Sequence, residues 1–224
     1  MSEITGTAEV PQLSPTEARI LGSLVEKEAT TPEAYPLTAN AVTLACNQKN
    51  NREPVLELEP GEVGHALREL ESRRLVRSLH GARAQRYEHR LAEAYSLTRA
   101  QQALLALLLL RGAQTVAELH ARSERLAKIA DLEETRQVLE RLAQRGIVAN
   151  LGRGPGQRED RWMHLLCGPV ELADLPPPRA SRGRDQDDGD ARDDTRAARI
   201  DALEARVEAL EAQVAGLVAA LGGG

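Results

Sequence analysis

Residues 58–76 read LEPGEVGHALRELESRRLV, and residues 130–148, 72 positions later, read ADLEETRQVLERLAQRGIV. Both stretches repeat apolar residues at the three- and four-residue spacing of a helix and end in an apolar pair that starts a strand. The apolar positions are Val63, Ala66, Leu67 and Leu70 in the first stretch and Leu132, Val138, Leu139 and Leu142 in the second. Residues 86–89 similarly match residues 161–164. The sequence therefore reads as one unit used twice.

Capping signals divide each unit into three helices. Ser14 and Glu17 form a capping box that opens the first helix, from about Pro15 to Glu28. The residues that start the remaining helices are Thr38 and Pro60 in the first unit and Thr98, Thr115 and Asp131 in the second. After Pro54, the alternation of apolar and polar residues in Val55-Leu56-Glu57-Leu58 predicts a brief strand before the third helix of the first unit. Three short helices in each unit share one apolar core.

A β-hairpin follows the third helix of each unit, and the tip of the second hairpin, residues 152–158, is rich in glycine and arginine. Three helices, a small strand and a terminal hairpin describe a winged helix-turn-helix. We predict an α+β fold, mainly α, with tandem winged helix-turn-helix domains at residues 13–93 and 94–172. A disordered N-terminus, residues 1–12, precedes them.

The C-terminal segment has a different pattern. Residues 173–195 are rich in Pro, Arg, Asp and Gly without an apolar period, which predicts a flexible linker. In residues 196–221 apolar residues alternate spacings of three and four, as in a coiled-coil heptad. These dimerisation residues are Ile200, Leu203, Val207, Leu210, Val214, Leu217 and Leu221. The pattern favours a parallel two-stranded coil and a homodimer; the alternative is an amphipathic helix packed on its own domain.

Composition excludes several classes of protein. The longest apolar run, Ala103–Leu110, is too short to span a bilayer, and no secretory signal is visible, so we expect a cytoplasmic protein without a membrane partner. Cys46 and Cys167 lie alone in apolar surroundings, which argues against a disulfide. No metal-ligand spacing, P-loop or GxSxG motif occurs, so we expect no enzyme, cofactor or metal. His89 and His164 end the two hairpins at matching places, which predicts a repeated structural role, such as a hydrogen bond to the first helix.

Nucleic-acid contact is the function that the residues favour. Residues 47–52 combine amides and cations just before the third helix, and such side chains bond phosphates and base edges. The candidate residues are Asn47, Gln48, Lys49, Asn51, Arg52, His65, Arg68, Arg73, Arg74, Arg83, Arg86, Arg153 and Arg158. An equally weighted alternative is that the asparagines cap helices and form turns. Glu62 and Glu69 share the face of Arg68, and the formal net charge of the chain is −5, both of which oppose tight binding.

The chain also resembles the bacterial YceH-like proteins, an uncharacterised family with a tandem winged-helix fold. The residues that carry the resemblance are 26–32, 35–38, 45–49, 51–55, 87–90, 107–115 and 163–165. Val116 stands where the family pattern has Pro, and Trp162 where Tyr is usual. The resemblance implies the architecture and supplies no substrate or catalytic residue.

Two hypotheses about function follow. The first is a dimeric regulator that binds double-stranded DNA through its winged helices and self-associates through its C-terminal helix. The second is a non-catalytic scaffold that uses winged helices to bind other proteins, which the near-neutral charge of the first 175 residues favours.

Overall fold

The computed structural model describes residues 12–80, 84–154, 158–170 and Arg206. The first half consists of α1 (Pro15–Thr30), β1 (Leu37–Thr38), α2 (Ala39–Cys46), α3 (Pro60–Ser72), β2 (Val76–His80), β3 (Gln85–His89) and α4 (Leu91–Ala94). The second half consists of α5 (Arg99–Arg111), β4 (Gln114–Thr115), α6 (Val116–Ser123), α7 (Leu132–Gln144), β5 (Val148–Asn150) and β6 (Arg161–His164). The predicted α+β class, mainly α, is confirmed for these residues.

The two halves repeat the same order of elements and the same strand pairing. Each forms a three-stranded antiparallel sheet, in the order β1-β3-β2 in the first half and β4-β6-β5 in the second. The register also repeats, because Val76 pairs with His89 where Val148 pairs with His164. Tyr87 and Trp162 occupy equivalent places in the two central strands and are both buried.

Side-chain caps fix where the helices begin. The side chains of Ser14 and Thr98 accept from the backbone N–H groups of Glu17 and Gln101, and both capping boxes are complete. The caps predicted at Thr38, Thr115 and Asp131 are also present. The prediction that Leu132 faces the core is wrong: as the first residue of α7 its side chain is 49% exposed. Thr135, one turn later, is buried and donates to the Asp131 carbonyl at 2.9 Å.

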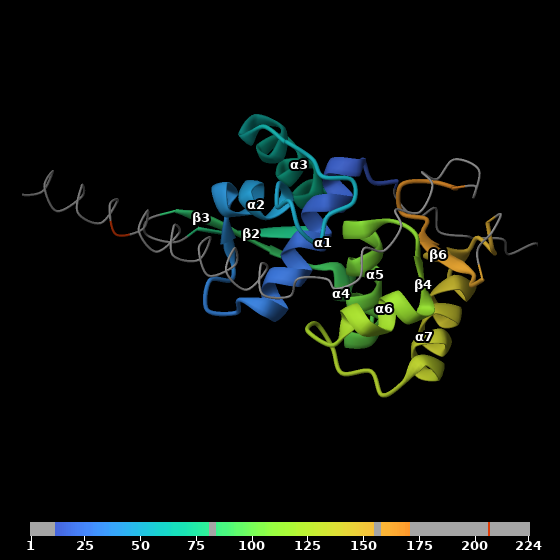
Figure 1. Cartoon of the computed structure of the whole chain (residues 1–224). Coiled ribbons are helices and arrows are strands. Elements are labelled where there is room, and N and C mark those ends of the chain that lie inside the picture. The colour runs from blue at the N-terminus through green and yellow to red at the C-terminus, as the bar shows by residue number, and fades with distance from the viewer. Residues whose placement is uncertain (1–11, 81–83, 155–157, 171–205, 207–224) are drawn as a thin grey trace, which may run out of the picture.

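The two first helices, α1 and α5, pack against each other at the centre of the molecule (Figure 1). They run antiparallel, since Gly22 of α1 lies against Leu109 and Leu110 near the end of α5, whereas Glu28 contacts Gln102 near its start. A Cβ atom on Gly22 would lie 2.8 Å from Leu110 Cγ, so glycine permits the close approach of the helices. The buried apolar residues of both halves form one cluster through this contact.

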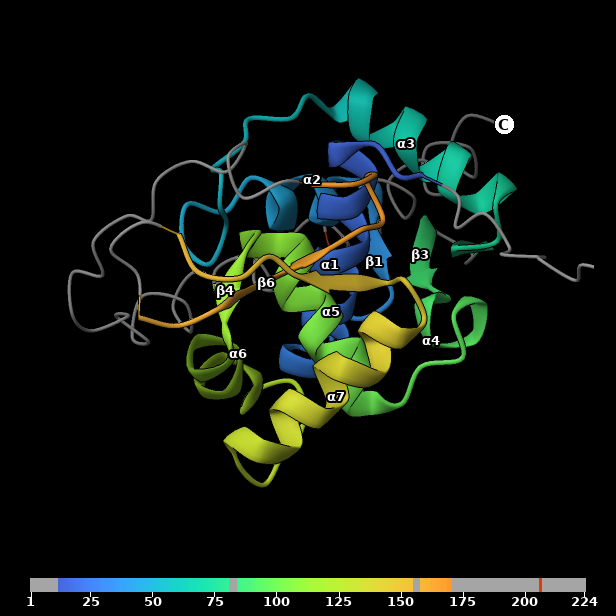
Figure 2. The same cartoon turned by 90° about the vertical axis from the view of Figure 1, so that its right-hand side faces the viewer.

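The remaining helices lie on the two sides of the central pair. In both views α3 lies on one side of the α1–α5 pair, and α7 lies on the opposite side (Figures 1 and 2). None of the described helices has the length and apolar character needed to span a bilayer. Residues 1–11, the linker at 173–195 and the coiled-coil residues from Ile200 to Leu221 lie outside the described residues, apart from exposed, helical Arg206.

Candidate nucleic-acid interface

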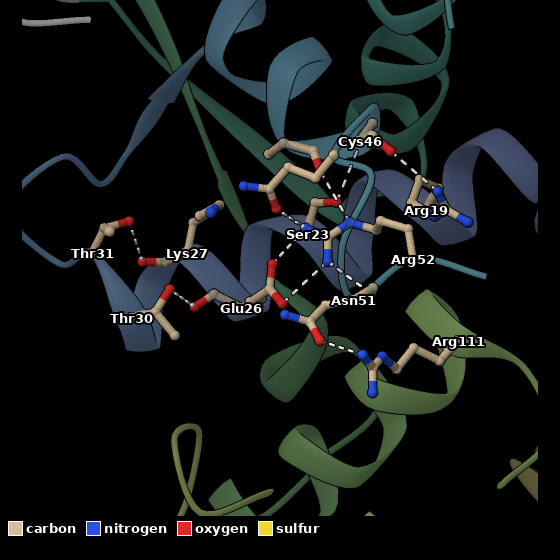
Figure 3. Close-up of polar contacts among 12 residues, drawn as sticks. Arg19, Ser23, Glu26, Lys27, Thr30, Thr31, Cys46, Asn51, Arg52 and Arg111 are labelled. Atoms are coloured by element: carbon tan, nitrogen blue, oxygen red, sulfur yellow. Dashed lines mark hydrogen bonds and ion pairs between the residues drawn. The ribbon is translucent and has the colours of Figure 1, made fainter. Parts of the chain in front are cut away.

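Arg52, a predicted DNA contact, lies in the interior. Its guanidinium donates to both carboxylate oxygens of Glu26 on α1, at 3.1 and 2.5 Å, and its side chain is fully buried (Figure 3). It also donates to the carbonyl of Ala45 at 3.0 Å and to the side chain of Gln48 at 2.8 Å. A guanidinium whose donors are used in this way cannot reach a phosphate, so Arg52 is removed from the candidate surface.

Arg19 forms the second part of this buried cluster. It donates to the carbonyl of Cys46 at 3.1 Å (Figure 3). It also donates to the carbonyl of Pro54 at 2.6 Å. Burial and the neighbouring charge of Arg52 lower the pKa of Arg19 to about 10, so it stays cationic at neutral pH. The carbonyls of Ala45 and Cys46 belong to the last turn of α2, where the helix dipole favours cations. The two arginines therefore complete the C-terminus of α2.

The amide side chains that follow α2 also have structural partners. The amide of Asn47 both donates to the carbonyl of Leu58 at 2.9 Å and accepts from its N–H at 2.8 Å. Asn51 has a positive φ of 57° and accepts from Arg111 at the end of α5. For Asn47 and Asn51 these contacts support the alternative that the asparagines form turns and caps instead of contacting DNA. Of the candidates in this run, Lys49 alone is exposed in the part of the chain that the structure describes.

Arg73 and Arg86 bond to the backbone, and each contact recurs in the second half. Arg86 donates to the carbonyl of Pro36 at 2.8 Å, directly before β1, and Arg161 donates to that of Ala113 at 2.6 Å, directly before β4. Arg73, at the C-cap of α3, forms an ion pair with Glu17 and donates to the carbonyl of Gln12 at 3.1 Å. Arg145, at the C-cap of α7, donates to the matching carbonyl of Ser96 at 3.4 Å. A contact made twice by the same fold indicates a structural residue.

The exposed candidates of the first half are few and face carboxylates. His65 and Arg68 lie on the exposed face of α3, with Glu62 and Glu69 beside them. Arg74 follows α3 in the left-handed conformation, with a φ of 60°, and is exposed. Arg83 lies outside the described residues.

The second half presents more exposed arginines than the sequence interpretation named. Arg153 and Arg158 are exposed at the β5–β6 hairpin, where Arg153 pairs with Asp160 at 3.2 Å. Arg136 and Arg141 are exposed on α7, and the sequence interpretation missed them. The 72-residue offset was the available signal, because it aligns residues 136–141 with the 64–69 face of α3.

The histidines that end the two hairpins differ in their surroundings. His89 Nε2 lies 3.1 Å from a carboxylate oxygen of Glu28 on α1, which confirms the predicted hydrogen bond to the first helix. His164 is buried, and its Nδ1 has no hydrogen-bond partner among the described residues. Burial lowers the pKa of His164 to about 4. Within the described ranges, no group of three or more His, Cys, Asp or Glu side chains could hold a metal ion.

Comparison with known proteins identifies the family. Residues 13–157 match the family described as "Protein of unknown function, DUF480". A UPF0502 protein of Xanthomonas euvesicatoria pv. vesicatoria (strain 85-10) is 58% identical over 172 residues, 77% of this chain and 78% of the relative. A UPF0502 protein of Stenotrophomonas maltophilia (strain K279a) is 56% identical over 183 residues, 82% of this chain and 84% of the relative. The chain therefore belongs to the DUF480 (UPF0502) family of uncharacterised bacterial proteins, consistent with its YceH-like resemblance.

Proposed function

We propose that this chain is a non-catalytic, tandem winged-helix protein that binds duplex DNA through its second half. In this proposal α7 is the helix that enters the major groove and the β5–β6 hairpin is the wing that meets the phosphate backbone. The observation that carries it is the set of exposed arginines on these two elements: Arg136 and Arg141 on α7, and Arg153 and Arg158 at the hairpin.

The second half is a better candidate than the first on charge. α3 carries one arginine and three glutamates, a net charge of −2, whereas α7 carries two exposed arginines and three glutamates, a net charge of −1. Because α3 and α7 lie on opposite sides of the α1–α5 pair, a straight duplex on α7 leaves α3 uncovered (Figure 2). One half per protomer therefore contacts DNA, and a dimer would supply the second contact.

A fluorescence anisotropy titration of a labelled duplex over a salt series tests this proposal. Each phosphate neutralised contributes about −0.9 to the slope of log affinity against log salt, so four arginines give a slope of about −4. The double variant Arg136→Gln/Arg141→Gln should weaken binding and reduce the slope by about 2. The matched control Arg77→Gln/Arg90→Gln removes two arginines that pair with Glu88 and Glu93 on the first half, and should change little.

Two results would contradict the proposal. Absence of binding at low salt removes DNA as the ligand. Equal weakening by the α7 variant and the control assigns the effect to net charge and removes α7 from the interface.

Self-association remains a prediction that rests on the heptad residues between Ile200 and Leu221. Light scattering of the full chain should give the mass of a dimer, and Leu210→Arg, which puts a charge at a d position, should give a monomer. A wild-type chain with the mass of a monomer would contradict dimerisation through the heptad residues.

A protein-binding scaffold is the second candidate, and exposed apolar side chains favour it. Leu44 on α2 and Val55 on the following loop are 39% and 44% exposed, and exposed carboxylates of Glu53 and Glu57 lie next to Val55 in the sequence. Such a surface repels DNA phosphates. If the duplex titration fails, Leu44→Ser with Val55→Ser should weaken capture of a protein partner from a lysate.

A further inference from the structure

A cavity of about 220 Å³ lies where the two halves meet, between α1, α4 and α5. Its apolar wall includes Val25 and Ala29 of α1, Leu97 before α5, and Leu126 after α6. The volume is below the roughly 300–1,000 Å³ typical of sites for drug-sized molecules. A ligand of this cavity is therefore a small molecule with an apolar body.

Three polar side chains also line this cavity: Glu28, Arg99 and Gln102. One oxygen of Glu28 lies 3.1 Å from His89 Nε2 and 3.5 Å from the amide nitrogen of Gln102. Since His89 Nδ1 accepts from the N–H of Leu91 at 3.3 Å, the proton belongs on Nε2 and His89 donates to Glu28. This hydrogen bond and the charge of Arg99 lower the pKa of Glu28, so it is an anion at neutral pH.

Both charged groups keep bonding capacity for a ligand. The structure records no partner for the second carboxylate oxygen of Glu28 among the described residues. Arg99 donates through Nε to the carbonyl of Leu126 at 3.4 Å, and within the described residues no partner is recorded for its two terminal nitrogens. Both charged residues are exposed, so the cavity combines an apolar wall with one anion and one cation at its solvent-facing edge.

We propose that this cavity binds a small zwitterion with an aliphatic body, of the chemical class of the aliphatic α-amino acids. The ligand carboxylate pairs with Arg99, the ammonium group pairs with Glu28, and the aliphatic side chain lies against Val25, Ala29 and Leu126. This site is separate from the proposed DNA interface. Its ligand contacts both halves at once.

Isothermal titration of the full chain with L-leucine, without DNA, tests the site. 4-Methylpentanoate is leucine without the ammonium group and isoamylamine is leucine without the carboxylate, so each should bind at least about tenfold more weakly than leucine. In Arg99→Gln the difference in affinity between leucine and isoamylamine should disappear, and in Glu28→Gln the difference between leucine and 4-methylpentanoate should disappear. Glu57→Gln and Arg77→Gln, exposed residues outside the cavity, are the matched controls.

Ala29→Leu provides an independent test, because the larger side chain fills the cavity without removing a charge. It should abolish leucine binding while the circular dichroism spectrum and the melting temperature stay close to wild type. The proposal is overturned if leucine does not bind up to about 10 mM, or if it binds no better than its single-charge analogues. Binding that Glu28→Gln, Arg99→Gln and Ala29→Leu leave unchanged would also overturn it.

Discussion

The first helices of the two halves, α1 and α5, bury different kinds of side chain at equivalent positions: polar ones in α1 and apolar ones in α5. In the first half, α1 buries Arg19, Ser23 and Glu26 against the loop that follows α2. At the matching places of the second half, α5 buries Ala103, Leu107 and Leu110. The loops also differ, since residues 47–59 join α2 to α3 but only residues 124–131 join α6 to α7. The polar cluster therefore accompanies the longer loop, and an apolar core suffices where the loop is short.

The largest expected effect comes from breaking this polar cluster. Glu26→Ala leaves the guanidinium of Arg52 buried without its carboxylate, which should cost about 3–5 kcal/mol of unfolding free energy. Urea denaturation measures the loss. The double variant Glu26→Leu/Arg52→Met, which imitates Leu110 of the second half, should recover much of it. If the double variant loses as much as the sum of the two single variants, the pair is not the source of the cost.

The burial of His164 at the end of β6 gives a pH-dependent effect on stability. His164 has a pKa of about 4 in the folded chain, below the ordinary value of 6.5, so the unfolded chain binds the extra proton. Its contribution to stability is complete above about pH 6.5 and should fall by about 3 kcal/mol by pH 4. Denaturation of His164→Gln between pH 7 and pH 4 should show a flatter pH dependence than wild type. His65→Gln, on the exposed face of α3, should retain the wild-type slope, and equal slopes for all three proteins would refute the assignment.

Paired substitution of the repeated arginines should affect the two halves alike. Arg86→Met and Arg161→Met each leave a carbonyl before β1 or β4 without its charged donor, which should cost about 1.5–3 kcal/mol apiece. Neither variant should weaken DNA binding once it is folded. A loss of affinity for DNA in Arg86→Met at unchanged stability would restore that residue to the proposed DNA interface.

Two glycines should respond to alanine in opposite directions. Gly22→Ala places a Cβ 2.8 Å from Leu110, and the required shift of α1 against α5 should cost about 1–2 kcal/mol after the gain in helix propensity. Gly64→Ala in α3 meets only the end of Arg68 at 3.8 Å, so it should stabilise by up to about 1 kcal/mol. Thermal denaturation compares them, and a stabilised Gly22→Ala would show that the helices are not in close contact.

The smallest change in stability is expected at the residues that follow α3 and α7, the third helix of each half. Arg74 and Gly146 both follow a helix with positive φ, and the next N–H, of Leu75 or Ile147, bonds back to the helix. Arg74→Gly should therefore stabilise by about 0.5–1 kcal/mol, and Gly146→Ala should destabilise by a similar amount. A destabilised Arg74→Gly or a stabilised Gly146→Ala, measured by thermal denaturation, would contradict the equivalence of these positions.

Local signals in the sequence predicted most of the fold, but the strand predicted at residues 55–58 is wrong. The small strand β1 lies at Leu37–Thr38 instead, and the backbone of Leu58 bonds to the side chain of Asn47. The caps at Ser14, Thr38, Thr98 and Thr115 fix helix starts through contacts within a few residues, and the apolar period marks the core side of each helix. The apolar period wrongly predicts a buried Leu132, because the first turn of α7 extends beyond the core. The packing of α1 on α5 was not predicted, although α5 is apolar on nearly all sides, which is typical of a helix covered all round.

The candidate site was harder to predict, because its residues depend on distant partners. Arg52 lies 26 residues from Glu26, and no local pattern links them. Arg73 and Arg86, by contrast, have arginine counterparts at Arg145 and Arg161, and that repetition was visible. Residues that recur in type and place in both halves are structural here, whereas Arg136 and Arg141 align with Gly64 and Glu69 of the first half.

The central claim is that the two halves unfold as one unit, because α1 and α5 share one core. Two local probes report on them: Trp162, the only tryptophan, is buried in the second half, and the thiol of Cys46 is buried in the first. In a Cys167→Ser chain, urea titration followed by Trp162 fluorescence and by pulsed labelling of Cys46 should give one shared midpoint, which Glu26→Gln lowers equally for both probes. A Trp162 transition that keeps its midpoint while Cys46 becomes reactive at lower urea would show two independent domains and contradict the claim.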